Sequence, residues 1–88
     1  MQPKNLMEEL VIMRVDDYMT KASMCKCPQC RSDVIALALN RLPPRYVTCT
    51  KGNVFARFEA QTNQERAEIS AAIIRAIEIV RKHPRHDE

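Results

Sequence analysis

The chain has 88 residues, of which 45% are hydrophobic and 28% are charged, and its formal net charge is +3. A chain of this length forms one domain with a thin core, so we expect residues 1–88 to be a single domain. The single glycine excludes G-x-G-x-x-G and Walker A nucleotide loops. Charges interrupt every apolar run, which predicts neither a membrane span nor a secretion signal, and therefore a cytoplasmic protein.

Positive charge is concentrated in the middle of the chain. Residues 21–57 contain seven lysines and arginines and a single acidic residue, Asp33, whereas the segments on either side are slightly acidic. A concentrated positive field favours anionic partners. The alternative is that these cations serve solubility and offset a cluster of thiolates.

The first predicted helix begins at Asn5 and runs to about Met19. Asn5 and Glu8 have capping-box spacing, in which each side chain accepts the backbone N–H of the other residue. The helix carries two apolar stripes, and a single intramolecular face needs only one. The second stripe is either a subunit contact or the sign of a helix wedged between two neighbours; it comprises Leu6, Leu10 and Met13.

A basic connector, residues 20–27, separates this helix from a second one predicted over Pro28–Asn40. Proline suits the first turn of a helix, and Pro43 with Pro44 ends the second helix. The β-branched residues of Tyr46–Thr50 and Val54–Phe58 predict a short β-hairpin, with an irregular crossing as the alternative.

The last helix follows a second capping-box pair, Thr62 and Glu65, and stops at Pro84. Its predicted buried face comprises Ile69, Ala72, Ile73, Ala76, Ile77 and Val80. Residues 84–88 are expected to form a flexible tail. The predicted fold is mainly α: a small helical domain of three or four helices with a short β-hairpin.

Four cysteines predict a structural zinc site. Cys25, Cys27 and Cys30 form a C-x-C-x2-C cluster, and Cys49 follows 19 residues later. Such a cluster without a secretion signal favours a metal over a disulfide framework, and tetrahedral zinc takes four soft ligands. The free N–H groups at the start of the second helix favour the thiolate form of Cys27 and Cys30.

The fourth zinc ligand is the open question of this site. Cys49 is the first choice, and His83 or His86 in the H-P-R-H tail is the alternative. A redox role for the Cys27–Cys30 pair is the rival to metal binding, although the pair lacks the βαβ context that such motifs normally have.

Catalysis is not expected. The two histidines lie near the C-terminal end, and the paired acids of the first helix suit a solvated face. The sequence therefore predicts a protein that is not an enzyme.

The string from Cys25 to Val47 combines the cysteine cluster with Asp33-Val34, Ala38-Leu39-Asn40 and Leu42-Pro43-Pro44-x-Tyr46-Val47. This string resembles the late competence development protein ComFB family. The resemblance implies a small, mainly helical, homodimeric zinc protein. It also implies binding of cyclic di-GMP or cyclic di-AMP and a regulatory role in competence, type IV pili or motility.

Residues of the second helix and the turn after it are the expected ligand site. The candidates are Arg31, Asp33, Asn40, Arg41, Pro44, Arg45 and Tyr46. Arg41 and Arg45 could grip phosphate through forked hydrogen bonds, Asp33 could accept from the edge of guanine, and Tyr46 could stack on a base.

Four of these assignments have a structural alternative. Asn40 could be only a helix C-cap. Asp33 could pair with Arg31 or lie beside the zinc ligands, Tyr46 could belong to the core, and Arg45 could be an ordinary surface residue.

We therefore expect a homodimeric cyclic dinucleotide receptor that passes its signal to an unidentified protein partner. The alternative is a zinc-stapled dimeric adaptor with no small ligand. A nucleic-acid-binding zinc module is the weakest hypothesis, because no helix is rich in arginine and lysine.

Overall fold

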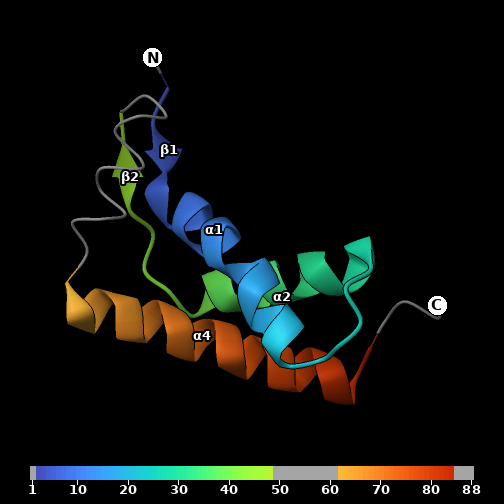
Figure 1. Ribbon diagram of the computed structural model, residues 1–88. Coiled ribbons are helices and arrows are strands. Elements are labelled where there is room, and N and C mark those ends of the chain that lie inside the picture. Colours follow the sequence, from blue (N-terminus) through green and yellow to red (C-terminus); the bar gives the residue numbers. More distant parts are fainter. Residues whose placement is uncertain (1, 49–61, 85–88) are drawn as a thin grey trace.

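The computed structural model describes residues 2–48 and 62–84, which form three α-helices and one two-stranded antiparallel sheet (Figure 1). In chain order the elements are β1 (Lys4–Asn5), α1 (Leu6–Lys21), α2 (Pro28–Asn40), β2 (Tyr46–Val47) and α4 (Asn63–Lys82). The predicted mainly α fold is confirmed for this part of the chain. The predicted tail beyond Pro84 lies outside the described residues.

Each helix begins at a side chain that accepts a backbone N–H from its first turn. Thr62 Oγ1 accepts from Glu65 N at 3.1 Å, as the capping-box spacing predicts. Asn5 Oδ1 accepts from Met7 N at 3.1 Å, so the predicted start of α1 is confirmed, but the bond reaches Met7 and not Glu8. At α2 the capping atom is a sulfur, because Cys27 Sγ accepts from the Cys30 N–H.

The short sheet joins two segments that are far apart in the sequence. Tyr46 pairs with Asn5, and Val47 pairs with Lys4. The sequence predicted that Tyr46–Thr50 would pair with a second strand at Val54–Phe58. That second strand lies outside the described residues. Asn5 Oδ1 also accepts from Arg45 N, 40 positions later, at 2.8 Å. These bonds fasten the segment after the prolines to the start of α1.

The core lies where α1 and α2 both pack against α4 and against each other (Figure 1). The buried face of α4 is the predicted one in full: Ile69, Ala72, Ile73, Ala76, Ile77 and Val80. None of the helices in residues 2–48 and 62–84 combines the length and hydrophobicity needed to cross a bilayer.

The two apolar stripes of α1 have a clear explanation in this packing. Leu6 and Leu10 are 1% and 0% exposed, because α1 contacts both of the other helices. The interpretation of a helix wedged between two neighbours is therefore confirmed for these residues, and a subunit contact through them is wrong. Met13, the third member of the stripe, is 37% exposed.

Candidate functional site

Three of the four cysteines gather at the start of α2. The Sγ atoms of Cys25, Cys27 and Cys30 all lie within 4.8 Å of one another. Cys25 is exposed in the connector, Cys27 is half-buried at the N-cap, and Cys30 is buried in the first turn of the helix. Sulfur ligands at about 2.3 Å from a tetrahedral zinc lie about 3.8 Å apart. The cluster is close to that spacing and could hold a metal ion.

The pKa values of Cys27 and Cys30 are shifted in opposite directions within the cluster. The N–H of Cys30 donates to the sulfur of Cys27 and lowers the pKa of Cys27 to about 7. Burial raises the pKa of Cys30 to about 12, and its two sulfur neighbours act in the same direction. A bound cation would offset both the burial and the repulsion among thiolates, so the donor set fits a thiophilic ion such as zinc.

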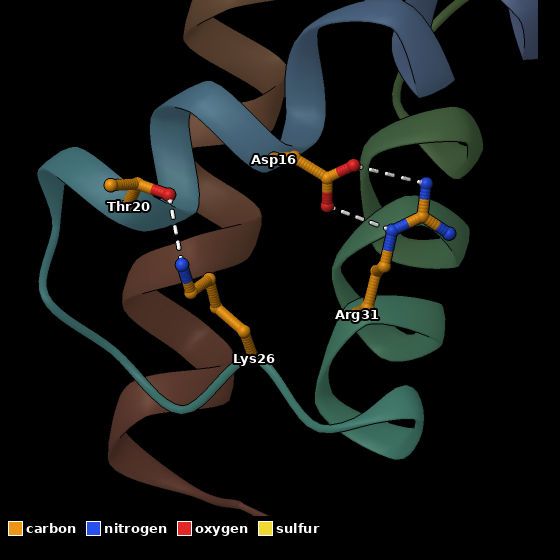
Figure 2. Close-up of polar contacts among 4 residues, drawn as sticks. All are labelled: Asp16, Thr20, Lys26 and Arg31. Atoms are coloured by element: carbon orange, nitrogen blue, oxygen red, sulfur yellow. Dashed lines mark hydrogen bonds and ion pairs between the residues drawn. The ribbon is translucent and has the colours of Figure 1, made fainter.

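Polar contacts join α1 to the connector and to α2 (Figure 2). Lys26 Nζ donates to Thr20 Oγ1 at 3.1 Å. The guanidinium of Arg31 forms two bonds to the carboxylate of Asp16, at 2.9 and 3.4 Å, and this ion pair raises the pKa of Arg31. Arg31, predicted as a ligand residue, is therefore placed where it fastens α2 to α1.

The connector between α1 and α2 turns sharply after the last helical residue. Ser23 has a φ of 54°, in the left-handed region, and its N–H donates to Thr20 O. A residue with a Cβ pays a steric cost in that region. This turn brings Cys25 back toward the start of α2.

At the other end of α2, a hollow of about 530 Å³ opens between the proline turn and α4. Its lining comprises Arg41, Leu42, Pro43, Glu68, Ala71, Ala72 and Arg75. A smaller hollow of about 110 Å³ shares Leu42, Pro43 and Glu68 with it. The larger volume lies within the usual range of small-molecule sites.

The predicted ligand residues divide between this region and the rest of α2. Arg41 lines the larger hollow, while Pro44 and Arg45 line the smaller one. Arg45 is more than ordinary surface, because its Nη1 pairs with Glu65 Oε2 at 3.4 Å. Tyr46 is 67% exposed, so its alternative assignment to the core is wrong.

Two further candidates lie on α2 itself and line neither hollow. Asn40 is exposed and is the last helical residue, and the C-cap position belongs to Arg41. Asp33 is half-buried and accepts from Gln29 Nε2 at 3.0 Å. Arg31, the alternative partner for Asp33, is bound to Asp16.

Sequence reasoning missed two lining residues, Glu68 and Arg75 of α4. They are seven positions apart, with Ala71 and Ala72 between them, and so lie on one edge of the helix beside its buried face. The sequence signal that could have identified them is this pair of opposite charges seven residues apart on either side of two alanines.

The cluster in the described residues consists of three cysteines, and none of the residues expected as a fourth ligand belongs to it. Cys49 and His86 lie outside the described residues. His83 is the exposed C-cap of α4 and does not belong to the group of close ligand atoms found in the described part of the chain.

Comparison with known proteins identifies the family. The family model of the late competence development protein ComFB matches residues 4–84. The chain belongs to the ComFB family. Competence protein ComFB of Bacillus subtilis (strain 168) is 31% identical over 80 residues, which cover 90% of this chain and 78% of that protein.

A solved structure supports the same assignment. The late competence protein ComFB from Bacillus subtilis superimposes on this ComFB-family chain with a TM-score of 0.80 and 27% identity, and the match covers 97% of both chains. The resemblance expected from the Cys25–Val47 string is therefore confirmed. This chain is a competence-related protein of the ComFB family with a cysteine cluster able to hold a metal.

Proposed function

We propose that this ComFB-family protein is a receptor for a cyclic dinucleotide, cyclic di-GMP or cyclic di-AMP, which binds in the hollow of about 530 Å³ between the proline turn and α4. The observation that carries the proposal is the presence of two arginines, Arg41 and Arg75, in the lining of one hollow. A cyclic dinucleotide carries two phosphates, and the arginine fork matches phosphate oxygens.

The surroundings of the two arginines support this role. Both are exposed, and within residues 2–48 and 62–84 neither forms an ion pair. Tyr46 is exposed two residues after Pro44 and lines neither hollow, and its ring would stack on a base that extends beyond the lining. Pro43 lines the hollow and gives it a rim that loses little conformational entropy on binding.

We propose that the metal is a structural Zn²⁺ held by the cysteine cluster with Cys49 as its fourth ligand. Zinc would anchor the start of α2, and the hollow lies at the opposite end of this helix. A site closed by four protein ligands has no open position for water, which fits a role without catalysis.

The receptor is proposed to act in the cytoplasm as a homodimer that signals to a protein partner. A two-fold symmetric ligand suits a two-fold symmetric protein. Exposed apolar residues on α1, Ile12 and Met13, offer surface for such contacts. Sedimentation equilibrium at micromolar protein tests the dimer, and a monomer with and without nucleotide would contradict it.

Calorimetric titration with cyclic di-GMP and cyclic di-AMP tests the receptor. We expect binding of at least one of them, and an affinity about tenfold to hundredfold lower for Arg41→Ala and for Arg75→Ala, since each loses charge-assisted hydrogen bonds. Lys82→Ala is the control, because it removes an exposed cation from the far end of α4. No heat with either nucleotide would contradict the proposal.

A structural adaptor without a small ligand is the second candidate. It is favoured by the exposure of large apolar side chains, Ile12, Met13, Ile74 and Ile79. Under this hypothesis, association with the protein partner is the same with and without nucleotide, and the arginines of the hollow contribute nothing to it.

A further inference from the structure

One feature of the hollow does not fit a site that binds phosphate alone. Glu68 lies in its lining together with Arg41 and Arg75, and it also lines the smaller hollow. A carboxylate repels phosphate, so its presence between cations weakens a pure anion site. It suits a ligand that presents hydrogen-bond donors beside its phosphates.

The carboxylate of Glu68 is oriented and still has free acceptor capacity. Gln64, one turn earlier on α4, donates from Nε2 to Glu68 Oε1 at 3.1 Å. An ionised carboxylate offers about four acceptor sites, and this bond uses one of them. Glu68 is exposed and forms no ion pair within the described residues, so Oε2 and the remaining acceptor site of Oε1 can both accept from a ligand in the hollow.

We propose that Glu68 reads the guanine base and makes this site selective for cyclic di-GMP over cyclic di-AMP. The proposal rests on the proposed function. Guanine presents two adjacent donors, N1–H and the exocyclic N2–H, and these match the two oxygens of a carboxylate. Arg41 and Arg75 then bind the phosphates, so that the two arginines and Glu68 each have a partner of matching chemistry on the ligand.

Adenine lacks both of these donors, since its C2 carries only a hydrogen. Its N1 is an acceptor, and the lone pair of this atom faces the carboxylate without a hydrogen to share. A group that receives donors discriminates against an analogue that lacks them, because an acceptor that the bound ligand covers is left unpaired. Guanine therefore donates two hydrogen bonds to the carboxylate, whereas adenine can donate only from its N6 amino group while its N1 lone pair repels the second oxygen.

The proposal moves base recognition from α2 to α4. The sequence predicted Asp33 as the guanine acceptor, but Asp33 is half-buried, lines neither hollow and accepts from Gln29. It also precedes Arg41 by eight residues, about 12 Å along the helix axis. Glu68 has the same chemistry and lies in the lining beside both arginines.

The test is calorimetric titration of the full chain, Glu68→Gln and Glu78→Gln with both nucleotides. Glu78 is exposed on the same helix, ten residues further on, and lines neither hollow, so its variant makes the same chemical change elsewhere. We expect the unaltered chain and Glu78→Gln to prefer cyclic di-GMP by about tenfold to hundredfold, the worth of one bidentate base contact. We expect the preference to fall below about threefold in Glu68→Gln.

The outcomes separate this inference from the proposed function. If the chain binds cyclic di-GMP but Glu68→Gln keeps the full preference, or if the chain prefers cyclic di-AMP, Glu68 does not select the base and the receptor proposal stands. If neither nucleotide binds, the receptor proposal fails, and the inference fails with it. Thermal melting of each variant confirms that the exposed substitutions leave the fold intact.

Discussion

Cys27 has two roles in the structure that substitution can separate. Its sulfur accepts the backbone N–H of Cys30 at 3.4 Å and so caps α2, and it is also one of the three sulfurs of the cluster. Serine is a good N-cap but a poor zinc ligand, whereas alanine is neither. Cys27→Ser therefore removes one role and Cys27→Ala removes both.

The expected effects differ with and without metal. In metal-free protein, loss of the cap in Cys27→Ala lowers the free energy of unfolding by about 1 kcal/mol, which lowers Tm by about 4–8 °C in a chain of this size. Cys27→Ser keeps the cap and should stay within a few tenths of a kcal/mol of the unaltered chain. With free zinc about a thousandfold above its Kd, the unaltered chain gains about 4 kcal/mol. Both variants should lose most of this gain.

The assay is thermal unfolding followed by circular dichroism, in a strong chelator and then with added zinc. Ser32→Ala is the matched control, because Ser32 is exposed on the same helix and does not belong to the cysteine cluster. Two results would refute the reasoning: a full zinc-dependent rise in Tm for Cys27→Ser, or equal stability of the serine and alanine variants without metal.

Three further predictions concern the core and the connector. Leu10→Ala should cost about 2–5 kcal/mol and lower Tm by at least about 10 °C, since Leu10 is fully buried. In metal-free protein at pH 7.5, iodoacetamide should label Cys27 well before Cys30, and lowering the pH through the Cys27 pKa of about 7 should slow this labelling as its thiolate is protonated. Ser23→Gly should raise the free energy of unfolding by up to about 1 kcal/mol, since φ is 54° there.

Each of these predictions has a direct check. Ile12→Ala, at a side chain that is 40% exposed, should cost far less than Leu10→Ala, and equal losses would contradict the packing. Peptide mapping by mass spectrometry measures the labelling, and equal rates at Cys27 and Cys30 would contradict their assigned environments. A lower Tm for Ser23→Gly would show that the serine side chain stabilises the turn.

The local features of the chain could be predicted because a few neighbouring residues decide them. Pro28 suits the first turn of α2, and Thr62 caps α4. The apolar spacing of α4 defines its buried face, so both helices are found where the sequence predicts them. The cluster of Cys25, Cys27 and Cys30 is local in the same sense. A helix start brings positions i and i+3 together, and the connector needs only a short turn to add the third sulfur.

Contacts between distant segments could not be predicted in this way. Tyr46 was expected to pair with a later strand, but the described partner of β2 is the N-terminal strand, and Asn5 receives the N–H of Arg45 from across the fold. The burial of Leu10 also depends on which helices surround α1. The two apolar stripes of α1 indicate a second contact face, but they do not say whether a helix of the same chain or another subunit covers it.

The sequence by itself determined the helices, the cysteine cluster and the family, because each depends on residues that lie close together along the chain. Only the tertiary structure decided what faces the proline turn. Glu68 and Arg75 lie beside Arg41 because α2 and α4 pack side by side, and residues about thirty positions apart meet there. A binding surface is made by such packing, so its composition follows from the fold and not from any one segment.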